Sequence, residues 1–241
     1  MRKAALALIT LLPMALAAPV WARQPVVVEL YTSQGCSACA KAGETLEGLD
    51  AKPPVLALTF GVDYWDYLGW TDTFAKPEFS ARQRDYMGRL ALRDVYTPQV
   101  VVDGQLEAAA TASDKIEALV KQAAHKHGDP PQVQFRKGEV AVGSAPVPKG
   151  GGEVWLVRYD PHDQAVAVKA GDNRGLSLVE HNVVKELTLL GRWTGRPGLY
   201  RLPPPTADGL ATAILVQGAH GGRILAVASP PDAPPHPGAS K

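Results

Sequence analysis

The hydrophobic pattern of the first half of the chain alternates between short apolar runs and segments with helical spacing. Val26–Tyr31 and Val55–Phe60 are β-branched, mostly apolar runs of the kind that form buried strands. The segment between them, from Cys36 to about Asp50, predicts a helix. Two such strands joined by a helix predict a βαβ unit with a parallel strand pair.

The pattern then predicts a second helix, a hairpin and a third helix. Pro77 suits the first turn of a helix that runs to about Leu92. Tyr96–Leu106 is apolar on both sides of an Asp103-Gly104 turn, which is typical of an antiparallel hairpin. The third helix is expected to be capped by Ser113 and to stop before Pro130.

Helical spacing largely disappears after Pro131, and short strand-like runs separated by Gly and Pro take its place. Such runs predict a small β-sandwich or barrel. They are residues 133–136, 140–142, 154–159, 165–168, 183–189, 213–217 and 224–228. The expected fold class is therefore α/β, with an N-terminal α/β domain over 23–129 and a β-rich, sandwich-like domain over 130–229. A Pro-rich tail over 230–241 is expected to be disordered.

The N-terminus has the pattern of a secretory signal peptide over residues 1–22. Arg2 and Lys3 precede an apolar run from Ala4 to Ala18 that is too short to span a membrane. Val20-Trp21-Ala22 places small residues at the positions required for cleavage, and Ala15-Leu16-Ala17 is a second candidate. We therefore expect a periplasmic or secreted protein with no membrane span in its mature form.

Composition narrows the function classes. The 241 residues carry 25 Lys and Arg against 24 Asp and Glu, a formal charge of +1, and show no basic cluster. Nucleic-acid binding is not expected, because it needs a concentrated basic face. The chain has only two cysteines, which is informative in an oxidising compartment.

Those two cysteines form the motif Cys36-Ser-Ala-Cys39, directly after a predicted buried strand. A helix starting there would direct its dipole and free N–H groups at Cys36 and lower the pKa of its thiol. Cys39, one turn further on, would then resolve a mixed disulfide formed on Cys36. Such a dithiol carries two electrons itself, so no dissociable cofactor is expected.

Thr97-Pro98 strengthens this interpretation, because it precedes a predicted strand at the point where thioredoxin-like folds carry a cis proline beside the disulfide. The backbone of Thr97 would then pair with an extended substrate. A purely structural disulfide stays an open alternative. A zinc site would need two further ligands from scattered histidines, and a Cu(I) carrier would need more soft ligands than the chain offers; no metal site is predicted.

Further candidates lie in the aromatic segment after the second strand. Asp63, Tyr64 and Trp65 are predicted to line a substrate groove beside the dithiol, and Asp63 is a hypothetical proton acceptor for Cys39. The same rings are also compatible with simple packing of a helix onto the sheet. His181 either faces the dithiol or serves in a hydrogen bond at the surface or between domains.

Several strings in the chain resemble secreted bacterial proteins grouped as domain-of-unknown-function family 1223. The resemblance spans about residues 26–228 and is carried by residues 28–39, 62–70, 81–83, 96–99, 102–104, 154–157, 182–184 and 191–195. It implies a thioredoxin-like domain fused to a β-rich domain, with no established substrate. Ala40-Lys41 departs from the paired prolines usual in the family after the second cysteine.

We therefore expect a periplasmic thiol–disulfide oxidoreductase that acts on protein or small-molecule thiols through Cys36 and Cys39, together with an unidentified redox partner. The alternative is a secreted, non-catalytic binding module whose disulfide is structural.

Overall fold

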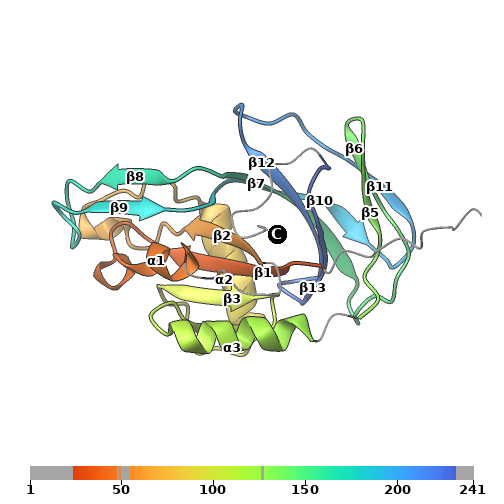
Figure 1. Ribbon diagram of the computed structural model, residues 1–241, viewed down its shortest axis with the longest axis horizontal. Coiled ribbons are helices and arrows are strands. Elements are labelled where there is room, and N and C mark those ends of the chain that lie inside the picture. The colour runs from red at the N-terminus through yellow and green to blue at the C-terminus, as the bar shows by residue number, and fades with distance from the viewer. Residues whose placement is uncertain (1–23, 48, 50–54, 126–127, 232–241) are drawn as a thin grey trace, which may run out of the picture.

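The computed structural model describes residues 24–47, 49, 55–125 and 128–231, and it shows a mixed α/β chain built on one large mixed sheet (Figure 1). The predicted signal peptide over 1–22 and the tail beyond residue 231 lie outside the described residues. The helices are few: α1 (Ala42–Glu47), α2 (Pro77–Arg89) and α3 (Ser113–Ala124), with the 3-10 turns η1 (Ser37–Cys39) and η2 (Asp66–Leu68).

None of the helices in the described part of the chain has the length and apolar character needed to cross a membrane.

The large sheet has eight strands in the order β13-β12-β7-β10-β2-β1-β3-β4. In chain order these strands are β1 (Val26–Thr32), β2 (Val55–Gly61), β3 (Gln99–Val102), β4 (Leu106–Ala109), β7 (Gly152–Asp160), β10 (Val183–Trp193), β12 (Ala211–Gly218) and β13 (Ile224–Ala228). A three-stranded sheet contains β5 (Val133–Arg136), β6 (Glu139–Val142) and β11 (Gly198–Arg201), and a hairpin contains β8 (Gln164–Ala167) and β9 (Ser177–Glu180).

The N-terminal half of the sheet follows the sequence pattern. β1 and β2 pair in parallel from Val26–Val55 to Thr32–Gly61, which confirms the predicted βαβ pairing. β3 and β4 form the predicted antiparallel hairpin. Asp103 and Gly104 both have positive φ angles, 47° and 65°, as a tight type I′ turn requires. A Cβ on Gly104 would also lie 2.5 Å from the Gly222 carbonyl oxygen, so this turn excludes larger residues.

Helices cover both faces of this half. Val26, Val28 and Leu30 of β1 pack against α1 and α3. Alternate residues of the same strand, Val27 and Tyr31, pack against α2 on the other face. The strand is buried on both sides, which explains why its sequence is nearly continuous in apolar residues.

The β-rich second half shares the same sheet. β10 lies beside β2 through the Val183–Thr59 pair, and the Thr59 backbone N–H donates to the Asn182 carbonyl oxygen at 3.1 Å. β7, β12 and β13 then continue the sheet outward. The three-stranded sheet contributes Val140 and Val142 to a hydrophobic cluster with Trp193 and Ile214 of the large sheet. The three-stranded sheet and the large sheet therefore pack as two layers, but the large sheet is shared with the N-terminal half.

Local details differ from the sequence expectation at a few points. β9 and β11 were not predicted; each has only four residues, and β11 has no fully buried side chain. α3 begins at Ser113 itself, so the position expected to be capped by Ser113 is taken by Ala112, which makes no side-chain cap.

Candidate functional site

The two cysteines form a disulfide at the end of β1, with their Cα atoms 5.3 Å apart. A turn leads from the strand to Cys36, whose backbone N–H donates to the Ser33 carbonyl oxygen at 3.2 Å. Cys36 is 4% exposed and Cys39 is 5% exposed, whereas Ser37 and Ala38 between them are exposed. The disulfide is therefore recessed beneath the exposed tip of its own turn.

The predicted continuous helix from Cys36 to about Asp50 is wrong. The chain forms the three-residue turn η1 and then the six-residue α1. The Cys36 carbonyl oxygen accepts from the Cys39 backbone N–H at 3.0 Å and from the Asn173 side chain at 2.8 Å. An α-helix would instead use that oxygen for the residue-40 N–H, which donates to Ser37. The helix-dipole reason for an acidic Cys36 thiol is thereby lost.

Thr97 and Pro98 lie beside the disulfide, although Thr97 is 61 positions away from Cys36 in sequence. The peptide bond between them is cis, as the sequence analysis expected. The Thr97 hydroxyl donates to the Cys36 sulfur at 3.3 Å, and the Thr97 carbonyl oxygen lies 4.0 Å from the same sulfur. Thr97 thus supplies the polar contact to Cys36 that the broken helix does not.

The residues of the aromatic segment that follows β2 have two different roles. The Trp65 indole N–H donates to the Thr97 hydroxyl oxygen at 2.7 Å, so Trp65 belongs to the site. The Tyr64 ring lies 6.0 Å from that of Trp65, and its hydroxyl donates to Gln83 of α2 at 3.1 Å. The Asp63 carboxylate accepts from Ser80 of α2 at 2.5 Å, and the structure pairs it with neither sulfur. Asp63 therefore joins the segment to α2.

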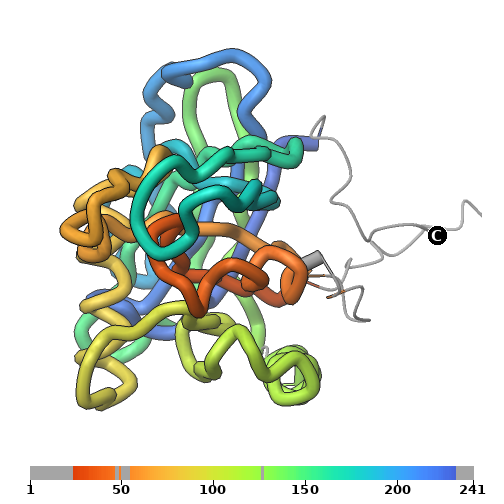
Figure 2. The backbone as a smooth tube through the Cα atoms, turned by 90° about the vertical axis from the view of Figure 1, so that its left-hand side faces the viewer, coloured from red at the N-terminus to blue at the C-terminus, as the bar shows by residue number. Residues whose placement is uncertain are grey.

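The loop of the β8–β9 hairpin, in the C-terminal half of the chain, contacts the dithiol turn through Asn173. The Asn173 side-chain amide donates two hydrogen bonds, to the Gln34 and Cys36 carbonyl oxygens, at 2.9 and 2.8 Å. Asn173 is 2% exposed and lies 137 positions from Cys36. Figure 2 shows the hairpin tip in front, between the red dithiol segment and the orange segment that follows β2. The C-terminal half therefore helps to shape the dithiol turn.

His181 lies at the base of this hairpin rather than at the sulfurs. Its Nδ1 atom is 2.6 Å from the Asp163 carboxylate, and its backbone carbonyl accepts from Thr59 at 2.6 Å. Within the described residues, no group of three or more His, Cys, Asp or Glu side chains is arranged to hold a metal ion.

Two buried acids stand behind the dithiol turn. Asp72 accepts from the Gln34 backbone N–H at 2.8 Å, and it is 4% exposed. Glu180 of β9 is 6% exposed, and its Oε2 atom has no hydrogen-bond partner. Burial, and then the negative charge of Asp72, raises the pKa of Glu180 to about 8. Glu180 is therefore largely protonated and neutral at pH 7.

Glu180→Gln is expected to change how stability depends on pH. Because the pKa of Glu180 rises from 4.5 when unfolded to about 8 when folded, the native state binds the proton more tightly. The stabilisation that comes from protonated Glu180 is fully present below pH 4.5. It is lost as the pH rises from there to about 8. The variant, whose amide stays neutral, should gain on the order of 4 kcal/mol over the wild type between pH 5 and pH 9. Urea unfolding of the oxidised proteins at both pH values measures this.

The exposed Glu139→Gln substitution on β6 is the matched control and should leave the pH profile unchanged. Parallel profiles for Glu180→Gln and the wild type would show that Glu180 is charged in the folded protein.

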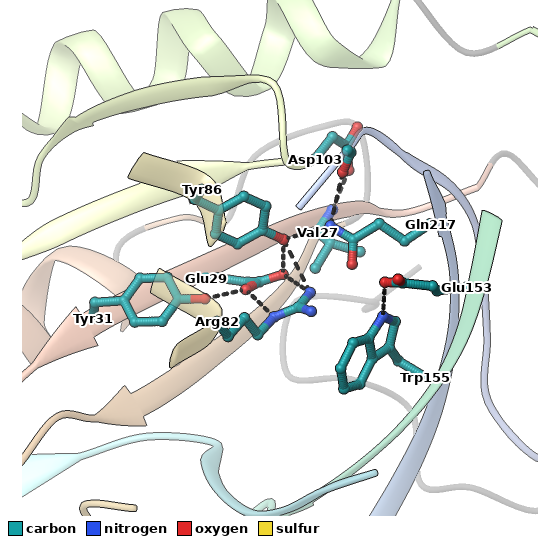
Figure 3. A network of polar contacts seen from close by, with 10 residues as sticks. Val27, Glu29, Tyr31, Arg82, Tyr86, Asp103, Glu153, Trp155 and Gln217 are labelled. Carbon is teal, nitrogen blue, oxygen red and sulfur yellow. Dashed lines mark hydrogen bonds and ion pairs between the residues drawn. The ribbon is translucent and has the colours of Figure 1, made fainter. Parts of the chain in front are cut away.

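A buried ion pair within the N-terminal half lies where strands of the C-terminal half pack against it. Arg82 of α2 donates to both carboxylate oxygens of Glu29 on β1, at 2.8 and 2.9 Å, and the two side chains are 4% and 1% exposed. Tyr31 and Tyr86 also donate to this carboxylate, and Gln217 of β12 donates to Tyr86 (Figure 3). Burial raises the pKa of both phenols well above the usual value, so both remain donors.

Asn173, Asp72 and Glu180 belong to the site but were not predicted from the sequence. Asn173 stands in Gly171-Asp-Asn-Arg-Gly175, a cluster whose local signal is only that of a turn. Its role depends on a contact across 137 positions, which no local pattern encodes.

This chain is similar to proteins of known structure. A crystal structure of a protein from Agrobacterium tumefaciens, from a structural genomics consortium, is 30% identical to this chain with a TM-score of 0.66. The alignment covers 85% of this chain and 92% of that one. HBP35 of Porphyromonas gingivalis aligns with a TM-score of 0.58 at 12% identity, over 86% of this chain and 75% of that one, which is a similarity of fold alone.

No functionally curated protein matches this chain. The family model described as "Protein of unknown function (DUF1223)" matches residues 27–217, which is most of the sequence and includes every residue of the site described above. This chain therefore belongs to the DUF1223 family.

Proposed function

We propose that this protein is a thiol–disulfide oxidoreductase in which Cys36 is the attacking sulfur and Cys39 the resolving one. The observation that carries the proposal is the 3.3 Å contact between the Thr97 hydroxyl and the Cys36 sulfur. A hydroxyl that donates to a sulfur stabilises the thiolate more than the thiol, and the thiolate is the nucleophile in exchange.

The chemistry needs only the two sulfurs and a substrate disulfide. The Cys36 thiolate attacks one substrate sulfur, a Cys36–substrate disulfide forms, and the other substrate sulfur leaves as a thiolate. Cys39, as a thiolate, then attacks the Cys36 sulfur, which forms the Cys36–Cys39 disulfide and releases the second substrate thiolate. Two electrons pass from the dithiol to the substrate, and the reverse sequence oxidises a substrate dithiol.

The order of elements supports a thioredoxin-like N-terminal part. A strand leads into the dithiol turn, a parallel strand follows, and a helix then connects to the Thr97-Pro98 loop, a hairpin and a last helix. We propose that the β-rich part over 130–229 is an addition to this unit that supplies Asn173. We propose a periplasmic or secreted location, which is supported by the sequence pattern of residues 1–22 and by the disulfide.

A second candidate function rests on the burial of the sulfurs. Cys36 and Cys39 are only 4% and 5% exposed, which favours a structural disulfide in a secreted binding module. The two functions differ in how easily the disulfide is reduced, because structural disulfides resist reduction by the glutathione pool.

The reduction potential separates these functions. We expect equilibration of the purified protein with reduced and oxidised glutathione to give a reversible two-electron couple with a potential above about −300 mV. The fraction of reduced protein is measured by thiol alkylation and mass spectrometry. A disulfide that stays oxidised at potentials below that value would assign the chain to the structural alternative.

A further inference from the structure

Trp65 and Thr97 form a short chain of hydrogen bonds that ends at the Cys36 sulfur. The Trp65 indole nitrogen lies 2.7 Å from the Thr97 hydroxyl oxygen, and that oxygen lies 3.3 Å from the sulfur. Trp65 comes from the segment after β2, whereas Thr97 precedes β3. Two loops that follow different elements therefore meet at one sulfur.

The direction of these hydrogen bonds follows from their chemistry. An indole N–H only donates, so the Thr97 oxygen must be the acceptor in its bond with Trp65. The Thr97 hydroxyl has a single hydrogen, and this hydrogen cannot point toward Trp65, because the indole hydrogen already occupies that side of the oxygen. The Cys36 sulfur lies on a remaining side within reach. The hydroxyl hydrogen is thus directed to the sulfur.

We propose that Trp65 is a positioning residue that holds the Thr97 hydroxyl in the orientation that donates to the Cys36 sulfur. Because this orientation favours the thiolate, Trp65 increases the fraction of Cys36 ready to attack. The inference rests on the proposed function, since an oriented donor matters only if Cys36 reacts.

The surroundings of Trp65 fix its ring. Tyr67 stacks on it with ring centroids 6.1 Å apart and planes inclined by 24°, and Tyr64 lies 6.0 Å away on the same segment. The Trp65 carbonyl oxygen accepts from the Leu68 backbone N–H at 3.0 Å and would lie 3.6 Å from a Cβ on Gly35. Side chain and backbone are therefore both held beside the dithiol turn.

The other polar contacts of Cys36 in the described chain come from neutral groups. Its backbone carbonyl accepts from Asn173 and Cys39, and its N–H donates to Ser33. These bonds involve the backbone and not the sulfur, whose remaining polar neighbour is the Thr97 carbonyl oxygen at 4.0 Å, a group with no hydrogen to donate. The Thr97 hydroxyl is therefore the donor whose loss should change the acidity of the thiol.

The test measures the pKa of Cys36 in the reduced protein from the pH dependence of its alkylation by iodoacetamide. Trp65→Phe keeps an aromatic ring but removes the N–H, and we expect a rise of about 0.5–1 unit, a three- to tenfold loss of thiolate at neutral pH. Thr97→Val should give an equal or larger rise. The double variant should match Thr97→Val alone, since Trp65 acts through Thr97. Thr97→Ser, which keeps the hydroxyl, should retain the wild-type value.

Trp155→Phe is the control, because the Trp155 indole donates to Glu153 on β7 and not to Thr97. An unchanged pKa in Trp65→Phe would overturn the proposal, and so would a double variant that exceeds Thr97→Val. The readout uses no substrate, so a protein without exchange activity but with the expected pKa pattern would refute the proposed function and leave the positioning role standing.

Discussion

Arg82→Met is expected to lower the free energy of unfolding by about 3–5 kcal/mol. The substitution keeps much of the side-chain length but removes the charge, so it leaves the Glu29 carboxylate buried without its ion partner. It also removes the guanidinium between the Tyr86 and Trp155 rings, whose centroids lie 5.2 and 5.5 Å from its central carbon. Urea unfolding of the oxidised protein at pH 7 gives the value.

Arg84→Met is the matched control, because Arg84 is exposed on the same helix and should change stability by less than about 0.5 kcal/mol. Adding Glu29→Gln to Arg82→Met removes the unpaired charge and should recover part of the loss. Equal effects of Arg82→Met and Arg84→Met would show that the buried ion pair does not stabilise the fold.

Cys36→Ala is expected to reduce the rate of exchange with a fluorescent glutathione disulfide by at least about 10³-fold, to the uncatalysed background. The remaining thiol, Cys39, lacks the contact from the Thr97 hydroxyl, which donates to the Cys36 sulfur. Cys39→Ala should retain the first exchange step and lose only turnover. Stopped-flow fluorescence of the reduced proteins separates the two steps.

The reduced wild type is the reference for folding in both variants, and their thermal unfolding temperatures should lie close to its own. A Cys39→Ala protein that loses the first step while Cys36→Ala keeps it would reverse the assigned roles.

Much of the fold was predictable because the strongest elements are local. The apolar runs at β1 and β2, the Pro77 helix start and the Asp103-Gly104 turn are determined by neighbouring residues, and the structure confirms each. The order of strands in the sheet was not predictable. It depends on β10 lying beside β2 through Val183 and Thr59, a pairing over more than a hundred positions that leaves no periodic signal.

In the candidate site, too, several residues were predictable from local sequence, whereas their long-range contacts were not. Cys36, Cys39, Thr97 and Trp65 were predicted, and the structure brings all four together. The helix expected at Cys36 was wrong: the Cys36 carbonyl oxygen accepts from Cys39 and from Asn173 of the distant hairpin, and not from residue 40 as in an α-helix. Asp63 has the right residue type for a proton acceptor, but its carboxylate is committed to Ser80. Tertiary contacts therefore decided which local predictions survived.

The central claim is that the sulfur of Cys36, a residue that is only 4% exposed, is the site of exchange in the folded protein. The most direct measurement incubates reduced Cys39→Ser with excess glutathione disulfide under native conditions and maps the product by mass spectrometry. We predict one glutathionyl group per chain, attached to Cys36 and stable because no second thiol can release it. A protein that accepts glutathione only after it is denatured would contradict the claim.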